Sequence, residues 1–201
     1  DPVALVAADA ARQVSRPPRS GSEHAETLLT QLSHLFEELT DTVDTAATRS
    51  GAGLLAAGAP ASDLVTLLDR VSIWHRRRSL VVLITDTAHP DPVLAPRVVD
   101  LLRRLSAQHE LTVIQIEDDD PLAPGRAHDI ELSGEVPAFL REDRALAARV
   151  SQQVLARRAA VTGALDARHI EYVTITDDAS LVDRIADLLA RQRLASSKRR
   201  R

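Results

Sequence analysis

The 201-residue chain has no cysteine, no methionine, and few aromatic side chains: one Trp, one Tyr and two Phe. The absence of cysteine excludes disulfides, thiolate catalysis and cysteine zinc sites. With so few aromatics, the chain lacks the stacking surfaces that bind single-stranded nucleic acids. Because position 1 is not Met, we expect the chain to be a piece of a longer polypeptide.

The chain also lacks an excess of positive charge and any long apolar run. Its formal net charge is −4 and its pI is near 6.0, which argues against a nucleic-acid-binding domain. No apolar stretch approaches the roughly 18–20 residues of a membrane helix, and no signal peptide opens the sequence. We therefore expect a cytoplasmic protein. Attachment to the cytoplasmic face of the membrane through upstream segments stays open.

Four short apolar runs have the composition of buried strands. They are residues 3–8, 80–85, 111–116 and 170–175. Amphipathic helical patterns lie between them. These patterns cover residues 28–39, 64–74, 94–105 (with Asp91 as N-cap and Pro92 at the first position), about 140–167, and 181–189. This alternation predicts an α/β fold: three layers, with a mostly parallel sheet covered by helices on both faces.

We expect a single domain over residues 1–194. Residues at about 40–60 are rich in Thr, Ala and Gly without a clear period, which is typical of a weak helix or an insertion. Residues 118–137 have the composition of a long connection. Residues 195–201, with Lys198 and three arginines, are expected to form a basic flexible tail.

Acidic residues follow each predicted strand. They are Asp9, Asp86, residues 117–120 and residues 177–178. Carboxylates gathered at the carboxyl edge of a parallel sheet suit a hard cation such as Mg²⁺. Asp is also an ordinary helix cap, which is the blander explanation for Asp177. Asp86 directly follows the most apolar strand, where a ligand site would lie. His89 either lines the same edge or is an ordinary loop residue.

Motifs for several enzyme classes are absent from the sequence. The segment 51–58 (GAGLLAAG) has the wrong glycine spacing for a dinucleotide fingerprint, and there is no phosphate-binding loop. No serine stands in a nucleophile elbow. These absences favour a binding protein over an enzyme.

Residues 62–64 (Ser-Asp-Leu) and 76–86 (RRRSLVVLITD) carry a family resemblance. They resemble the von Willebrand factor A-like proteins called domain of unknown function 58. In that family a Gly-Thr-Asp-Leu segment opens a helix that ends in an Arg-rich turn, before a hydrophobic strand closing in Ser/Thr-Asp. Residues 1–7 with 17–29, 109–121 and 129–140 are similar to further family segments. The family's first strand has no counterpart here.

The resemblance implies a metal-ion-dependent adhesion site with three parts. Asp86 matches the Asp after the central strand, and Ser62 matches the loop Thr while keeping its hydroxyl. The first part, an Asp-x-Ser-x-Ser loop, is missing, since the segment after Asp9 has neither serine. Two protein ligands leave most of the Mg²⁺ octahedron to water. Mg²⁺ binding is therefore expected to be weak or absent.

Family members are typically encoded beside MoxR-type AAA+ ATPases, so the resemblance implies such an ATPase as partner. We thus expect a non-enzymatic protein-binding module with a partial or degenerate metal site. The alternative is a Mg²⁺-dependent phosphoryl-transfer or hydrolytic enzyme that uses Asp86. A purely structural role is a third hypothesis.

Overall fold

The computed structural model describes residues 1–8, 13–49, 63–74, 78–117, 128–129, 134–135, 143–177 and 179–199. The chain divides into two compact units. Unit 1 comprises Asp1–Trp74 and Asp120–Arg149, and unit 2 comprises His75–Asp119 and Val150–Arg201.

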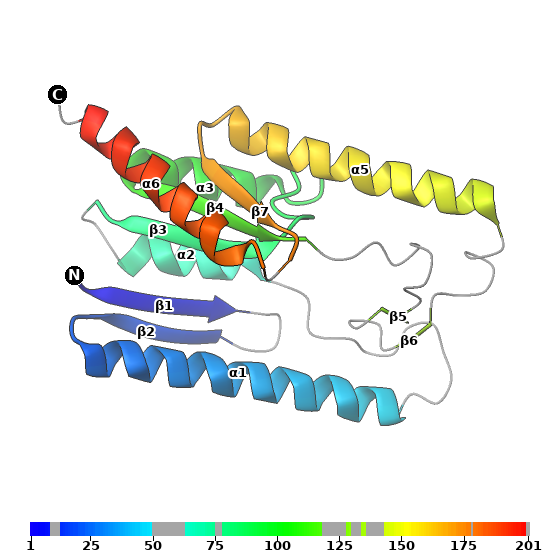
Figure 1. Ribbon diagram of the computed structural model, residues 1–201, viewed down its shortest axis with the longest axis horizontal. Coiled ribbons are helices and arrows are strands. Elements are labelled where there is room, and N and C mark those ends of the chain that lie inside the picture. Colours follow the sequence, from blue (N-terminus) through cyan, green and yellow to red (C-terminus); the bar gives the residue numbers. More distant parts are fainter. Residues whose placement is uncertain are drawn as a thin grey trace. The chain divides into compact units, whose positions relative to one another are not determined.

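Unit 2 is built on a three-stranded parallel sheet in the order β3-β4-β7 (Figure 1). The strands are β3 (Leu80–Asp86), β4 (Glu110–Ile116) and β7 (Glu171–Ile175). In β4 the residues from 111 to 115 are all buried, as expected of a central parallel strand covered on both faces.

Helices flank this sheet on opposite faces (Figure 1). They are α3 (Pro96–Gln108), which contacts β4, and α6 (Leu181–Arg199), which contacts β7. A third helix, α5 (Arg144–Asp166), begins in unit 1 and enters unit 2 at Val150. The core of unit 2 is aliphatic. Its buried members include Leu83, Val98, Leu101, Leu102, Leu105, Val113, Ile114, Val161, Leu165, Ile175 and Leu188. Unit 2 is thus a three-layer α/β fold, as the sequence predicts.

Unit 1 contains an antiparallel hairpin and two helices. The hairpin pairs β1 (Val3–Ala8) with β2 (Gln13–Arg19). The helices are α1 (Ser22–Arg49) and α2 (Leu64–Trp74), and α2 contacts β1. Arg70 stands over the Trp74 ring, 5.3 Å from its centroid. The short strands β5 (His128–Asp129) and β6 (Gly134–Glu135) pair antiparallel.

Most predicted elements are confirmed, including the helix at 64–74 and the three strands of unit 2. The strand predicted at residues 3–8 is confirmed, but its expected burial in the parallel sheet is wrong. These residues form β1, which is exposed or half-buried and pairs antiparallel with β2 instead of joining the parallel sheet. The sequence analysis missed β2 because Pro17 and Pro18 cannot donate to a ladder and therefore argue against a strand.

Two helix boundaries also differ from the prediction. Pro96, not Pro92, is the first residue of α3, because Asp91 caps a separate turn just before it. Helix α1 continues to Arg49, so it includes the first part of the expected insertion. Residues 50–62 lie outside the described residues. The single domain over residues 1–194 and the flexible tail stay predictions, although α6 extends to Arg199.

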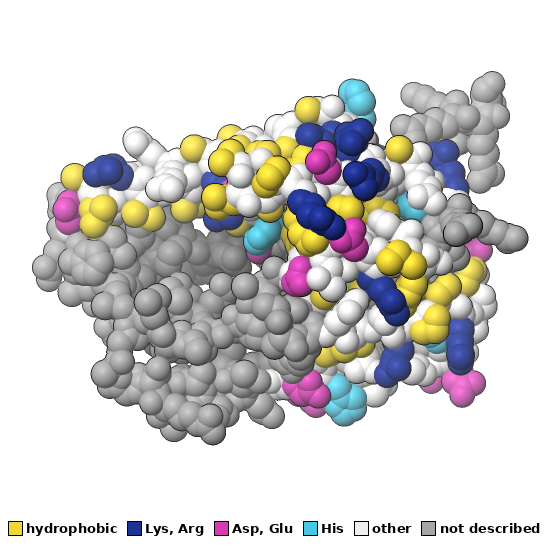
Figure 2. All heavy atoms as spheres, turned by 180° about the vertical axis from the view of Figure 1, so that it is seen from behind, with side chains coloured by type: hydrophobic (Ala, Val, Ile, Leu, Met, Phe, Trp, Pro, Cys, Tyr) yellow, Lys and Arg dark blue, Asp and Glu magenta, His cyan; other side chains and the backbone are white. Residues whose placement is uncertain are grey.

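None of the described helices is both long and apolar enough to cross a membrane. One face of the molecule is shown in Figure 2, where arginine and carboxylate side chains of the described residues are interspersed among apolar ones.

Candidate functional site

The candidate site is the end of the unit 2 sheet where its three strands finish. Asp86 closes β3 and lies opposite Ile116, and Ile116 lies opposite Ile175. The strands therefore end at the same level. The residues that follow the strands, including Glu117 and Asp177, therefore lie at one end of the sheet, as the sequence predicts for the described carboxylates. Asp9, residues 118–120 and Asp178 lie outside the described residues.

Asp86 forms a pair with His89, three residues later in the turn after β3. The Nδ1 atom of His89 lies 2.9 Å from both carboxylate oxygens, and the Ala88 N–H donates to Oδ1 at 2.7 Å. Burial raises the pKa of Asp86, but the hydrogen bond and charge of His89, the Ala88 N–H and the charge of Arg157 outweigh it. The net pKa lies below the ordinary value, so Asp86 is ionised at neutral pH.

Asp91 organises the second half of the same loop. Its side chain is buried, and its Oδ1 accepts the N–H groups of Val93 (2.8 Å) and Leu94 (2.9 Å). Arg157 of α5 donates to Oδ2 at 2.7 Å. The Leu94 N–H lowers the pKa of Asp91 most; the Val93 N–H and Arg157 lower it further against the opposing effect of burial. A long-range ion pair thus fixes a local turn.

A buried glutamine joins this loop to the sheet. Gln115 of β4 is 1% exposed, and its Nε2 donates to the His89 carbonyl at 3.1 Å. The Thr174 hydroxyl donates to its Oε1 at 3.5 Å. Gln115 therefore connects β4 to β7 and to the turn that carries Asp86.

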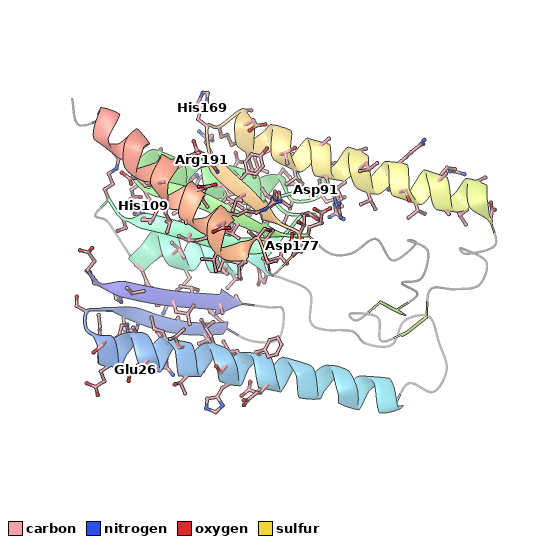
Figure 3. All side chains as sticks on the ribbon, in the orientation of Figure 1. Glu26, Asp91, His109, His169, Asp177 and Arg191 are labelled. Carbon is pink, nitrogen blue, oxygen red and sulfur yellow. The ribbon has the colours of Figure 1, made fainter. Side chains whose placement is uncertain are left out.

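The other carboxylates of this edge are each engaged locally. Arg158 of α5 donates to Glu117. Asp177 accepts the N–H (2.7 Å) and hydroxyl (3.0 Å) of Ser180 and the hydroxyl of Thr176, so it holds the turn that leads into α6. These bonds lower the pKa of Asp177. In Figure 3, Asp177 and Asp91 lie toward this end of the sheet, away from His169.

The described carboxylates of this end of the sheet do not by themselves form a magnesium site, and the site predicted from Ser62 and Asp86 stays a prediction. Both oxygens of Asp86 already accept hydrogen bonds, and Glu117 and Asp177 are held by other partners. Within the described ranges, no group of three or more His, Asp or Glu could hold a metal ion. Ser62, the other predicted ligand, lies outside the described residues. Its neighbour Asp63 caps α2 by accepting the Thr66 N–H at 3.0 Å.

Sequence reasoning found Asp86 and left His89 open, but it missed Arg157, Arg158 and Gln115. The two arginines lie on α5 and reach carboxylates 66 and 41 residues earlier in the chain. Nothing in a single sequence pairs residues at such separations. The polar Gln115 in an apolar strand was the one signal available.

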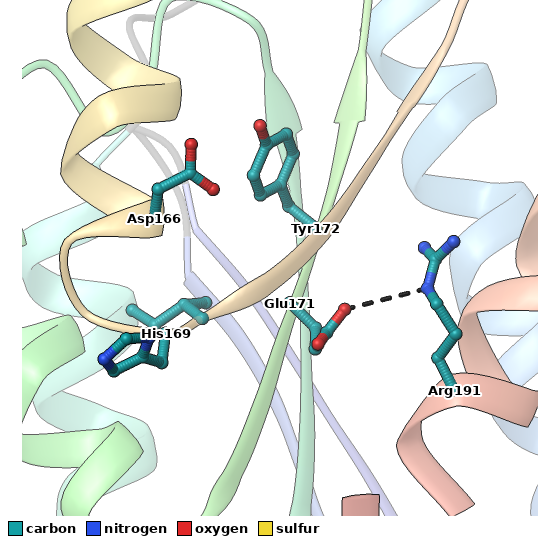
Figure 4. A pocket seen from close by; sticks show the side chains of 6 residues that line it. Asp166, His169, Glu171, Tyr172 and Arg191 are labelled. Atoms are coloured by element: carbon teal, nitrogen blue, oxygen red, sulfur yellow. Dashed lines mark ion pairs between the residues drawn. The ribbon is translucent and has the colours of Figure 1, made fainter. Parts of the chain in front are cut away.

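A hollow of about 410 Å³ lies at the opposite end of the sheet (Figure 4). It is lined by Asp166, His169, Ile170, Glu171, Tyr172 and Arg191. The Glu171 carboxylate and the Arg191 Nε atom are 3.7 Å apart, and both side chains are about half exposed. This pair is solvent-exposed, whereas Asp91 at the other end of the sheet is buried and bonded to three groups, so the end that carries Asp86 is the better candidate.

Residues 1–160 match the family described as protein of unknown function DUF58. The chain belongs to this family. The DUF58 match includes β1 through β6 and most of α5, and so contains Asp86, His89, Asp91, Arg157 and Arg158. Strand β7 and helix α6 follow the matched region of the DUF58 chain. No curated protein and no solved structure matches it.

Proposed function

We propose that this DUF58 chain is a non-enzymatic protein-binding module of the von Willebrand factor A-like type. Its docking surface is the loop between β3 and α3. The observation that carries the proposal is the turn at residues 91–94. Buried polar groups hold this turn in place, and its Val93 (79%) and Leu94 (72%) side chains are exposed to solvent.

The rigidity comes from buried polar groups. Asp91 is 4% exposed and accepts two backbone N–H groups and one Arg157 N–H. Pro90 beside it is less than 2% exposed. Ordering a flexible loop on binding costs free energy, and a loop that is already ordered in the free chain avoids that cost. Aliphatic side chains on such a turn suit an apolar pocket on the partner.

We propose a MoxR-type AAA+ ATPase as that partner. Membership of the DUF58 family supports this choice, since the family resemblance is what suggests the ATPase. Such a partner needs ATP, so the pair would act in the cytoplasm or at its face of the membrane. The apolar turn gives the interaction a contact that requires no metal.

We further propose that Mg²⁺ bridging contributes little. His89 and Ala88 already share the carboxylate of Asp86, so a cation or an electrophile there would compete with them for its oxygen lone pairs. The same geometry gives less support to a Mg²⁺-dependent enzyme that uses Asp86.

The test is a binding titration between this chain and the MoxR-type ATPase encoded nearest to it, with ATP and Mg²⁺ present. We expect saturable binding that is weakened roughly tenfold or more in the double variant Val93→Ser, Leu94→Ser, because buried aliphatic anchors dominate interface energies. The control is Val182→Ser, which changes an equally exposed valine (73%) on α6.

A titration with Mg²⁺ separates the contribution of the metal from that of the apolar turn. Calorimetric titration of Mg²⁺ into the chain alone should give no tight binding, and Asp86→Ala should not alter that result. Failure of the wild-type chain to bind the ATPase would overturn the proposed partner. Equal binding by the Val93/Leu94 variant and the wild type would overturn the proposed surface.

A further inference from the structure

Two consecutive arginines of α5 bind carboxylates that follow two different strands of unit 2. Arg157 donates to Asp91, in the loop after β3, at 2.7 Å. Arg158 donates to Glu117, the residue after β4. Neighbouring residues of a helix point about 100° apart, so the two side chains reach different partners. Helix α5 is therefore tied by charge to a loop and to a strand end of the same unit.

The two arginines continue the buried stripe of α5. Val161 and Leu165 are 0% and 1% exposed. They follow Arg157 by four and eight residues and Arg158 by three and seven, which places all four side chains on one side of the helix. Apolar packing thus holds α5 at residues 161–165, and ion pairs hold it at residues 157–158.

Asp91 serves the loop and α5 with the same carboxylate. Its Oδ1 atom accepts the N–H groups of Val93 and Leu94, and its Oδ2 atom accepts the Arg157 Nε–H. Asp91 is buried, and a buried carboxylate that loses its cationic partner is strongly destabilised. A rearrangement of the turn therefore costs α5 an ion pair, and a displacement of α5 costs the turn an anchor.

Glu117 differs from Asp91 because its backbone is part of the sheet. Its N–H donates to the Ile175 carbonyl at 2.8 Å, which continues the pairing of β4 with β7. Arg158 therefore fastens α5 to the sheet, whereas Arg157 connects α5 to a loop. Of the two arginines, Arg157 is the one that relates the position of α5 to the conformation of the loop.

We propose that Arg157 is a positioning residue that couples the order of the turn at residues 91–94 to the seating of α5 on the sheet. Such coupling is reciprocal, because whatever stabilises one of the two segments must also stabilise the other. The consequence for the ATPase rests on the proposed function. A partner bound to Val93 and Leu94 should slow the opening of α5, a helix that the partner need not touch.

Amide exchange in the free full chain tests the coupling by reading each substitution at the other end of the ion pair. Arg157→Gln should speed exchange at residues 93–95 roughly threefold or more. Asp91→Asn keeps an acceptor for the turn and should have the same effect at residues 156–160 of α5. Exchange at residues 163–165, where α5 is held by apolar packing, should change less.

Two further substitutions serve as controls. Arg157→Lys keeps the positive charge, so exchange at residues 93–95 should be closer to wild type than in Arg157→Gln. Arg149→Gln makes the same change at an exposed arginine of α5 and should alter neither segment. Circular dichroism checks that each variant is folded.

A double variant distinguishes coupling from two local effects. The variant Asp91→Asn, Arg157→Gln should exchange no faster at either segment than the faster single variant, because both changes remove the same ion pair. Strictly additive effects would overturn the proposal. So would effects confined to the loop in Asp91→Asn and to α5 in Arg157→Gln.

The same measurement with the MoxR-type ATPase present tests the consequence for docking. Exchange at residues 156–160 should slow in the wild-type chain and much less in Arg157→Gln. Binding of the ATPase without any slowing at α5 would overturn the coupling. Absence of binding would instead overturn the proposed function, and the exchange of the free chain alone would then decide whether the coupling exists.

Discussion

The two units of the chain contain similar kinds of element but differ in how they bury apolar side chains. Among the described residues, the buried hydrophobic side chains of unit 1 are Leu28, Leu64 and Leu68, and the remaining ones lie in unit 2. The unit 2 sheet is parallel, and such sheets are stable when both faces are covered. The unit 1 hairpin has no fully buried residue.

Unit 1 also has polar contacts at its surface. Arg16 of β2 donates to Gln31 of α1, and the His24 Nε2 atom lies 2.9 Å from the Val3 carbonyl oxygen. Such exposed bonds contribute little each. Because most buried apolar side chains lie in unit 2, we expect most of the stability of the chain there, and substitutions of graded effect test this expectation.

The largest effect is expected from truncating the core of unit 2. Leu102→Ala removes a side chain that is 1% exposed, which should lower the free energy of unfolding by roughly 2–5 kcal/mol. Urea unfolding followed by far-ultraviolet circular dichroism measures this loss. Leu29→Ala, at a leucine 64% exposed on α1, is the control and should stay within about 0.5 kcal/mol of wild type.

The matching truncation in unit 1 should cost less. Leu28→Ala removes a leucine of α1 that is 7% exposed, and we expect a loss of about 2 kcal/mol, at the low end for such changes. The same urea titration checks it. A loss equal to that of Leu102→Ala would mean that the two units contribute equally to stability, and would contradict the expectation that unit 2 contributes more.

Removing the buried amide should have a smaller effect, confined to unit 2. Gln115→Leu leaves the His89 carbonyl and the Thr174 hydroxyl without this partner, at a cost of about 1.5 kcal/mol. The exposed Gln152 of α5 supplies the control, Gln152→Leu. Amide exchange should also quicken at the 86–91 loop in Gln115→Leu, and unchanged exchange there would contradict the proposed anchoring.

The last prediction concerns how stability depends on pH in acid. The folded-state pKa values of Asp86 and Asp91 lie below their ordinary value of 3.8. Their contribution to stability is therefore fully present above that value and is lost as the pH falls through the folded-state values. Urea unfolding between pH 6 and pH 3 should show a shallower acid loss in the double variant Asp86→Asn, Asp91→Asn. An unchanged slope would count against these two carboxylates.

Much of the fold could be predicted from local patterns. The apolar runs at 80–85 and 111–116 have the length and composition of buried strands, and Leu64–Trp74 has a clear helical period. The hairpin was not predicted because its second strand contains Pro17 and Pro18, and proline ordinarily argues against a strand. An edge strand can nevertheless accommodate it. Asp91 followed by Pro92 is a sound helix-start signal, but the carboxylate caps a turn that ends before Pro96.

The candidate site could be predicted only in part, because local sequence patterns reveal some of its residues and not others. Asp86 could be found because it directly follows a recognisable strand, and the family resemblance pointed to it as well. The pairing of His89 with Asp86 depends on a turn conformation that the sequence leaves open. The roles of Arg157 and Arg158 depend on how α5 packs, which no local pattern encodes.

The division into two units also distributes the chain's fluorescent side chains. The single Trp, at position 74, ends α2 in unit 1, and the single Tyr, at position 172, lies in β7 of unit 2. Selective excitation of tryptophan therefore reports on unit 1 without any label, and tyrosine emission reports on unit 2. A thermal scan that records both emissions can distinguish sequential from concerted melting of the two units in the unmodified protein.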